Sequence, residues 1–134
     1  LSGGSISYYA GSWKSFGITN SAGEATKEML ANSYTFSMNY EGTLKEKVQQ
    51  VETGSTVAFQ TVRVNVKLQD AQGNPLDGPI DYYAGGWRPF GTSASGEASK
   101  ELLAGTYTLS AIAGGTRKEI VANTVSDPNI VVQF

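Results

Sequence analysis

Residues 8–17, YYAGSWKSFG, return as residues 82–91, YYAGGWRPFG, at an offset of 74 residues (82 − 8). The similarity continues in residues 23–31, GEATKEMLA, which return as residues 96–104, GEASKELLA, at an offset of 73 (96 − 23). The second copy has therefore lost one residue between the two blocks. A repeat of this length predicts that the chain contains two copies of one small domain.

Residues 62–69, VRVNVKLQ, carry the clearest strand signal of the chain. Valine and leucine alternate with polar residues, so one face of the strand is apolar and the other polar. Residues 70–75, DAQGNP, end this strand in a turn, because Gly permits a positive φ and Pro removes a ladder donor. The other predicted strands are residues 24–29, 34–40, 56–60, 97–102, 107–111 and 129–134, together with segments around residues 6–8 and 80–82.

Short strands between Gly-rich turns, without helical periodicity, favour an all-β fold of antiparallel β-sandwiches. The repeat divides the chain into residues 1–60 and 61–134, each near the lower size limit of a domain. Residues 56–60 run directly into residues 61–64 without a Pro, Gly or Ser spacer. We therefore expect two tandem sandwiches stacked end to end as a rod.

The first repeat lacks its N-terminal strand. Leu1 aligns with Leu76, so the strand and turn of residues 61–75 have no counterpart in repeat 1. Its absence would expose unpaired backbone groups and part of a core. Exchange between identical chains cannot supply the strand, because each chain carries one for two domains. We therefore expect a longer array with neighbouring repeats as partners, and an open edge on repeat 1 where a partner strand could add and build a filament.

The composition argues against several classes of function. The 134 residues include no Cys and no His, so disulfides, thiolate or imidazole metal sites and His-dependent nucleophilic catalysis are not expected. The net charge is −2 and the ten Lys and Arg residues are scattered, which makes nucleic acid an unsuitable partner. No apolar run approaches the roughly 20 residues of a membrane span. The chain is expected to be no enzyme and to use no catalytic residue, metal or cofactor.

Residues 62–78 follow the pattern VxVxVxLxDxxGxPLxG, and residues 103–109 are LAGTYTL. These motifs resemble the prealbumin-like β-sandwich repeats of bacterial surface proteins, which include carboxypeptidase regulatory-like domains and collagen-adhesin B-type stalk repeats. The resemblance covers all of repeat 2 and repeat 1 without its first strand. It implies Ig-like or prealbumin-like sandwiches and an extracellular or cell-surface location. The YYAGxWxxFG block resembles a subgroup of tandem repeats in large secreted bacterial proteins.

Stalk repeats of the collagen-adhesin type often carry an intramolecular Lys–Asn bond promoted by a buried Glu. The resemblance would make Lys67 and Asn129 the bonded pair. The chain departs from that pattern, because Lys67 lies on the polar phase of its strand and no Glu follows residues 107–109. The bond is therefore not expected here.

Each copy also carries an aromatic block beside a turn. The candidate ligand-binding residues are Tyr9, Trp13 and Lys14 in repeat 1, and Tyr83, Trp87 and Arg88 in repeat 2. Sugar sites use flat aromatic faces against the apolar side of a pyranose ring, with polar groups that fix its orientation. Two such platforms on one chain could act together. The alternative is structural, since a Trp at a hairpin end often caps the core of a small sandwich.

Two pairs of carboxylates have the same spacing. Glu24 with Glu28, and Glu97 with Glu101, lie four residues apart, which is roughly 13 Å along a strand at about 3.3 Å per residue. That separation is too long for a retaining acid–base pair. Lysines next to these residues favour a solvated edge.

The turn after the clearest strand contains three oxygen-bearing residues. Asp70, Asn74 and Asp77 surround it, and oxygen ligands of this kind can hold Ca²⁺. Their spacing misses the known calcium-loop motif, and turn formation by Asp and Asn accounts for the same residues.

The sequence thus predicts a non-enzymatic extracellular structural module, a stalk, fibre element or spacer of a larger bacterial surface or secreted protein. The basis is repetition without a linker, the lack of a catalytic set, and an exterior rich in Ser, Thr and Gly. The alternative is a carbohydrate-binding or adhesive module that presents its Tyr and Trp turns to a polysaccharide or glycan. A third reading, an accessory domain of a polysaccharide-degrading enzyme, would share that binding role.

Overall fold

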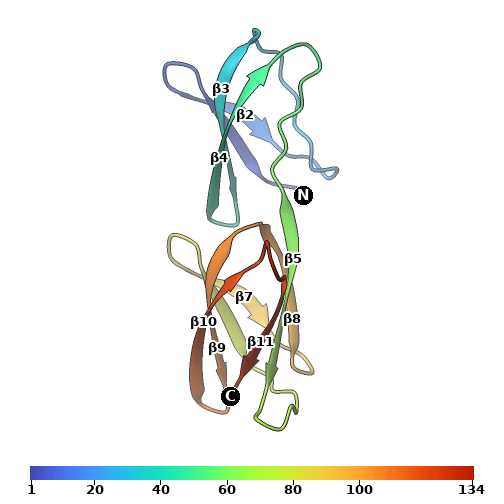
Figure 1. Ribbon diagram of the computed structural model, residues 1–134, viewed down its shortest axis with the longest axis vertical. Helices are drawn as coiled ribbons and strands as arrows, with labels where there is room; N and C mark the ends of the chain where they lie inside the picture. The colour runs from blue at the N-terminus through green and yellow to red at the C-terminus, as the bar shows by residue number, and fades with distance from the viewer. The chain divides into compact units, whose positions relative to one another are not determined.

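The computed structural model describes residues 1–134 and contains strands and turns but no helix. The chain forms two compact units, Leu1–Gln60 (unit 1) and Thr61–Phe134 (unit 2) (Figure 1). Its strands make three sheets, one in unit 1 and two in unit 2. The predicted all-β fold is therefore confirmed.

Unit 2 contains two sheets. The first has four strands in the order β10-β9-β6-β7, and the second has three in the order β11-β5-β8. The strands of the first sheet are β6 (Pro79–Tyr83), β7 (Trp87–Thr92), β9 (Thr106–Ala113) and β10 (Thr116–Asn123). Those of the second sheet are β5 (Thr61–Gln69), β8 (Glu97–Leu103) and β11 (Asn129–Gln133).

The two sheets of unit 2 share one apolar core. In β5, Val64, Val66 and Leu68 are each at most 1% exposed, as the period of two in this segment predicts. Full burial of such a side chain contributes about 1.5–3 kcal/mol to folding. The same core includes Ile80, Tyr82, Phe90, Leu102, Tyr107, Leu109, Ala111, Ile130 and Val132. Two sheets around one common core are consistent with a β-sandwich.

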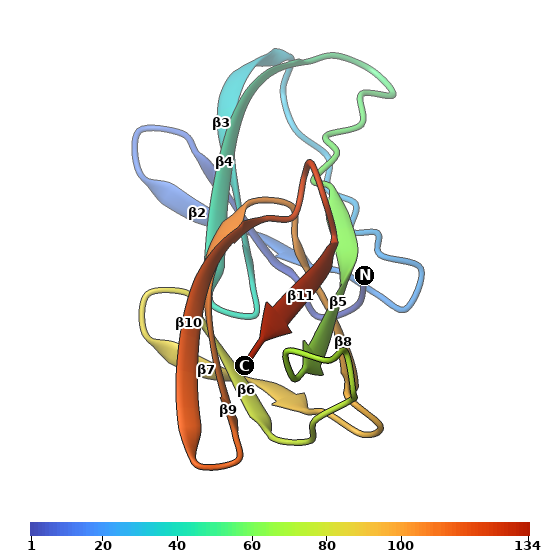
Figure 2. The same ribbon diagram turned by 60° about the horizontal axis from the view of Figure 1, so that its bottom comes forward.

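One strand pair differs from the predicted antiparallel arrangement. β11 pairs with β5 in parallel, with Asn129 opposite Asn65 and Gln133 opposite Gln69. Figure 2 shows β5 between β11 and β8. The alternation of buried and exposed residues determines which face of a strand is buried, but it carries no information on strand direction. The sequence pattern therefore could not predict that β11 and β5 pair in parallel.

Unit 1 reproduces the first sheet of unit 2. Its single sheet has the strand order β2-β1-β3-β4. The strands are β1 (Ser5–Tyr9), β2 (Trp13–Ile18), β3 (Asn32–Tyr40) and β4 (Thr43–Val51). Even the irregularity of the first hairpin recurs, since the register shifts directly after Ile6 in unit 1 and after Ile80 in unit 2.

Two strands predicted for unit 1 are absent. Residues 24–29 and 56–60 are irregular, whereas their counterparts in unit 2 form β8 and β11. In unit 2 both strands pair with β5. Unit 1 contains no counterpart of β5, so these segments have no ladder to join. Strand propensity depends on the neighbouring strand, and here the neighbour is missing.

The sequence pattern also does not predict β4 or β10. Both are edge strands with three consecutive charged residues, at positions 45–47 and 117–119. Charged side chains on an edge discourage pairing with other chains. They also remove the apolar alternation by which a strand is recognised. These two strands are defined by their antiparallel pairing with β3 and β9.

A tyrosine hydroxyl closes the same turn in both units. The Tyr34 hydroxyl donates to the Leu30 carbonyl oxygen at 3.0 Å, and the Tyr107 hydroxyl donates to the Leu103 carbonyl oxygen at 2.6 Å. Tyr107 is buried, whereas Tyr34 is only partly so. A buried tyrosine needs a partner for its hydroxyl. The repeated Tyr-Thr segment therefore carries both a core ring and the bond that fixes the turn before it.

Candidate aromatic surface site

Each unit presents a Tyr–Trp pair at the end of its first hairpin. Tyr9 lies opposite Trp13 in the β1–β2 pair, and Tyr83 lies opposite Trp87 in the β6–β7 pair. The Gly inside each turn has a positive φ, 75° and 69°, which Gly adopts without strain. Residues opposite one another in an antiparallel pair share a face. The repeated YYAGxW block therefore builds each pair through local geometry alone.

The rings of each pair meet edge to face. Their centroids are 5.6 Å apart at 70° for Tyr9 and Trp13, and 5.5 Å apart at 77° for Tyr83 and Trp87. All four side chains are about half exposed, including Trp13 at 48% and Trp87 at 47%. Trp87 is not part of the core of unit 2. The hairpin ends thus offer accessible aromatic surface, held in place by a favourable ring contact.

The two cationic candidates do not join these ring pairs. Lys14 lies opposite Tyr8, and Arg88 lies opposite Tyr82. Cross-strand partners share a face, so both cations extend from the face that does not carry the Tyr–Trp pair. Arg88 Nε donates to the Ala84 carbonyl oxygen at 3.3 Å. The structure therefore assembles an aromatic pair in each unit without an adjacent charge from Lys14 or Arg88.

A different lysine in each unit contacts an aromatic ring. Lys27 Nζ lies 5.7 Å from the centroid of the Tyr8 ring, and Lys100 Nζ lies 5.9 Å from that of Tyr82. At an exposed site such as that of Lys27, a cation–π contact contributes about 0.5–1 kcal/mol. The sequence pattern assigned these lysines to a solvated edge. The signal that points to the contact is the recurrence of the same Lys and Tyr positions in both copies.

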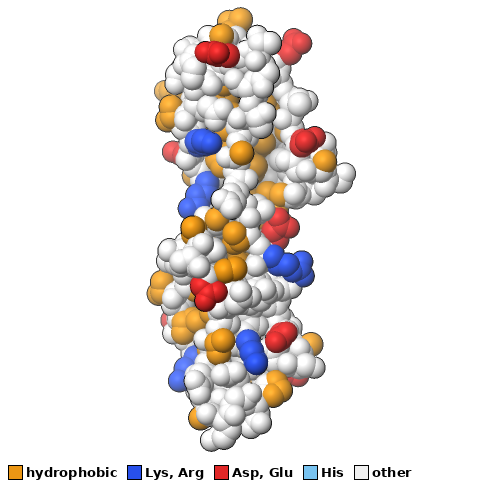
Figure 3. Space-filling view, turned by 45° about the vertical axis from the view of Figure 1, so that its right-hand side comes forward, with side chains coloured by type: hydrophobic (Ala, Val, Ile, Leu, Met, Phe, Trp, Pro, Cys, Tyr) orange, Lys and Arg blue, Asp and Glu red, His pale blue; other side chains and the backbone are white.

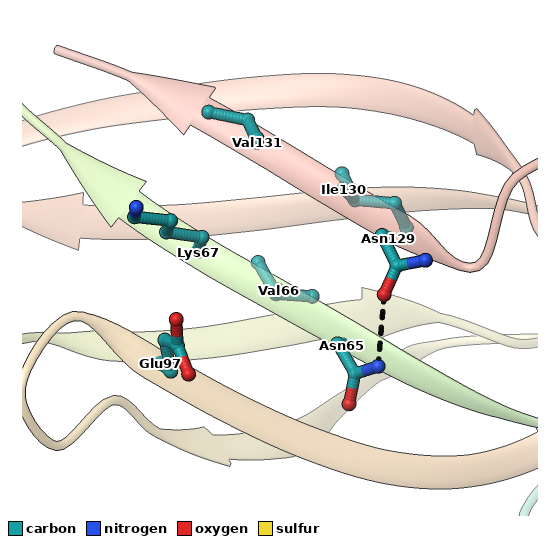
Figure 4. A pocket seen from close by; sticks show the side chains of 7 residues that line it. All are labelled: Asn65, Val66, Lys67, Glu97, Asn129, Ile130 and Val131. Carbon is teal, nitrogen blue, oxygen red and sulfur yellow. Dashed lines mark hydrogen bonds between the residues drawn. The ribbon is translucent and has the colours of Figure 1, made fainter. Parts of the chain in front are cut away.

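A shallow hollow lies over the second sheet of unit 2 (Figure 4). Its polar lining consists of Asn65, Lys67, Glu97 and Asn129. Asn65 Nδ2 donates to Asn129 Oδ1 at 3.0 Å, and the register places Lys67 opposite Glu97. Figure 4 shows Lys67 and Asn129 separated along the strands, and Asn129 and Glu97 are both exposed. This arrangement does not form the buried Lys–Asn–Glu group of an intramolecular Lys–Asn bond.

The turn after β5 uses its oxygen atoms internally. Asp70 Oδ1 accepts hydrogen bonds from the N–H groups of Gln72 at 2.9 Å and Asn74 at 2.8 Å, and Oδ2 accepts one from Asn74 Nδ2 at 2.8 Å. These bonds, that of the Asn74 side chain above all, hold the pKa of Asp70 below its usual value. Asp77 Oδ1 accepts from the Gly96 N–H at 2.8 Å. The chain contains no group of three or more acidic side chains placed to hold a metal ion.

The paired carboxylates do not converge on a site. Glu97 and Glu101 lie on β8, and Glu101 Oε1 accepts a hydrogen bond from Thr61 Oγ1 at 2.6 Å. Glu24 and Glu28 are exposed on the irregular segment of unit 1. Neither pair lies in an enclosed pocket with its two carboxylates at a distance suited to acid–base catalysis.

The surface shows no concentration of positive charge on the face drawn in Figure 3, where Lys and Arg side chains lie scattered among Asp and Glu. The structure contains no apolar helix of the length that a membrane crossing needs. Comparisons with protein-family models, curated proteins and solved structures give no match for this chain.

Proposed function

We propose that the chain is a non-enzymatic structural module. Its two units would be tandem Ig-like or prealbumin-like sandwich repeats, the first lacking its N-terminal strand, in a load-bearing stalk, fibre element or spacer of a larger extracellular or cell-surface bacterial protein. Neighbouring repeats of the same protein would be its partners. The observation that carries this proposal is the parallel pairing of β5 with β11 in unit 2.

This pairing sets how unit 2 responds to tension. β5 begins the unit at Thr61 and β11 ends at Gln133, and the two strands run in the same direction. A pull on the two ends therefore drags the strands in opposite directions along their common ladder. Parallel ladder bonds are evenly spaced, so the pairs from Asn65–Asn129 to Gln69–Gln133 bear the load together. Such shear geometry suits a segment that transmits force.

We expect unit 2 to unfold at a severalfold higher force when it is pulled at residues 60 and 133 than when it is pulled at residues 72 and 133. The second geometry opens the ladder from the end where Gln133 lies opposite Gln69, so the pairs separate one after another. The chain has no Cys, so Gln60→Cys or Gln72→Cys, each combined with Gln133→Cys, gives unique attachment points. Single-molecule force spectroscopy on the full chain measures the difference, because forced unfolding reports the unfolding rate.

The control is built into this comparison, because both variants keep the same core and ladder. Circular dichroism and thermal unfolding should show that the two double-Cys variants are equally folded and equally stable. Equal unfolding forces in the two geometries would remove the load-bearing role from this module, even though the fold would stand.

A second candidate function is carbohydrate binding or adhesion. The observation in its favour is the half-exposed Tyr–Trp pair, which recurs in both units with nearly the same ring geometry. An exposed aromatic face packs against the apolar side of a sugar ring. Two weak sites on one chain would gain from effective concentration on a polysaccharide. An accessory domain of a polysaccharide-degrading enzyme would use the same surface.

A glycan array with the full chain tests this second function. We expect the Trp13→Ala, Trp87→Ala double variant to lose binding by about tenfold or more, equivalent to about 1.4 kcal/mol. The matched control is the Lys14→Ala, Arg88→Ala double variant, which should bind as the parent does because these cations lie off the aromatic face. Failure of the folded parent chain to bind any glycan would eliminate this function and leave the structural one.

A further inference from the structure

The apolar face of the unit 1 sheet is only partly covered. Leu30 is 85% exposed, whereas its counterpart Leu103 in unit 2 is fully buried. Tyr8 and Ile6 are likewise only partly buried, although the equivalent Tyr82 is 0% exposed. The same residue types at the same positions thus have less cover in unit 1. In unit 2, the second sheet covers these side chains.

Two segments of unit 1 also lack backbone partners. Residues 25–31 and 56–60 make no hydrogen bond between backbone groups. In unit 2 the equivalent strands β8 and β11 both pair with β5. The Leu30 and Thr56 carbonyl oxygens accept hydrogen bonds from the Tyr34 hydroxyl and from Gln49 Nε2. The other N–H and C=O groups of these segments are open to pairing with an incoming strand.

Residues 24–29 remain near the position that β8 holds in unit 2. A Cβ atom at Gly17 would lie 3.6 Å from the Ala25 Cβ, just as one at Gly91 would lie 3.9 Å from the Ala98 Cβ. Lys27 Nζ also donates to the Ser15 carbonyl oxygen at 3.2 Å, which ties this segment to β2. The segment that would flank a counterpart of β5 on one side is therefore already in place in unit 1, although that strand is absent.

We propose that unit 1 is an acceptor for a β5-type strand from another polypeptide segment, an extended run with apolar, mostly β-branched residues at alternate positions. Unit 2 identifies this occupant, because β5 fills the equivalent place there and buries Val64, Val66 and Leu68. β5 itself is engaged on both edges by β8 and β11, so it is not free to serve unit 1. The inference rests on unit 1 alone and goes beyond the proposed mechanical role.

The register of unit 2 specifies how the donor strand binds. Val66 lies opposite Ala98 on β8 and Ile130 on β11. The donor residue equivalent to Val66 would therefore lie between Ala25 and Val57. The donor would run antiparallel to residues 24–30 and parallel to residues 56–60. Main-chain hydrogen bonds on both edges would supply affinity, and the alternating apolar side chains would supply specificity.

A peptide with the sequence of residues 61–69, TVRVNVKLQ, tests the proposal on the unmodified full chain. The control peptide, TVRDNDKLQ, carries Asp in place of the residues equivalent to Val64 and Val66. Hydrogen exchange resolved by NMR measures the amides of residues 25–30 and 57–60. We expect the first peptide to slow their exchange by about tenfold or more and the control peptide to have no effect. The amides of β5, β8 and β11 in unit 2 serve as the internal reference and should not change.

Each other outcome overturns the proposal. Equal exchange with both peptides, or no slowing with either, would mean that unit 1 does not accept a β5-type strand. Slowing in the chain alone that grows with protein concentration would assign this face to a second copy of the chain. Since the protein is identical in every arm, misfolding of a variant cannot account for a difference. A failure here would leave the force measurement on unit 2 unaffected.

Discussion

Replacing Tyr82 with alanine is expected to lower the free energy of unfolding of unit 2 by about 3–5 kcal/mol, the range for removal of a large buried aromatic side chain. Tyr82 is 0% exposed, and its ring meets those of Phe90 and Tyr107 with centroids 6.4 Å and 6.0 Å away. A whole domain is stable by only about 5–15 kcal/mol. Urea unfolding followed by Trp87 fluorescence, in a Trp13→Phe background, measures the loss.

Two tyrosines provide matched controls for this substitution. Tyr83→Ala removes the next side chain, which is 51% exposed, so its effect should stay within about 1 kcal/mol. Tyr8→Ala removes the equivalent of Tyr82 from unit 1, where the side chain is only partly buried. Followed by Trp13 fluorescence in a Trp87→Phe background, it should cost less than Tyr82→Ala. Equal losses at Tyr8 and Tyr82 would contradict the partial cover of the apolar face of the unit 1 sheet.

Gly78→Ala is the second substitution with a large expected effect. A Cβ atom at this position would lie 1.8 Å from the carbonyl oxygen of Ile112, a backbone atom that cannot rotate away. The Gly78 N–H also donates to Ser93 Oγ at 2.9 Å, so a displaced backbone would break that bond. Overpacking typically costs about 1–3 kcal/mol, and we expect the upper end of this range or more, measured by urea unfolding of unit 2.

The chain offers two controls for this glycine. A Cβ atom at Gly86 would meet nothing within 4 Å, so Gly86→Ala should change the stability by no more than about 0.5 kcal/mol. Gly4 is the equivalent of Gly78 in unit 1, and there the nearest atom is the Met38 sulfur at 2.7 Å. A flexible methionine can move, so Gly4→Ala should cost less. A neutral Gly78→Ala would show that the chain does not approach Ile112 this closely.

The strands with one buried face could be predicted from sequence, because burial on one face imposes a period of two. Residues 62–69 and the aromatic segment of residues 34–40 are the clearest cases, and both are strands. Residues 24–29 show the limit of the method. They match residues 97–102 almost type for type, yet only the second segment is a strand, because only that one has β5 beside it.

For the candidate site too, only part of the arrangement could be predicted from sequence. The contact of Tyr9 with Trp13 follows from a short hairpin turn, which sequence reveals. The position of Lys14 does not follow from its place next to Trp13, because consecutive residues of a strand point to opposite faces. The contact of Lys27 with the Tyr8 ring joins residues distant in sequence. Sequence could suggest that contact only through its recurrence in the second copy.

The parallel pairing of β5 with β11 also affects the order in which unit 2 can fold. Asn65 and Asn129, whose side chains form a hydrogen bond between these two strands, are separated by 64 positions in the chain. Closing a loop of that length adds little to the equilibrium cost, which grows only with the logarithm of length, but distant pairings slow folding. A ribosome delivers β5 first and β11 last, so the hairpins of unit 2 can form while one edge of β5 is still bare. Unit 2 is therefore vulnerable to mispairing until its final five-residue strand has emerged.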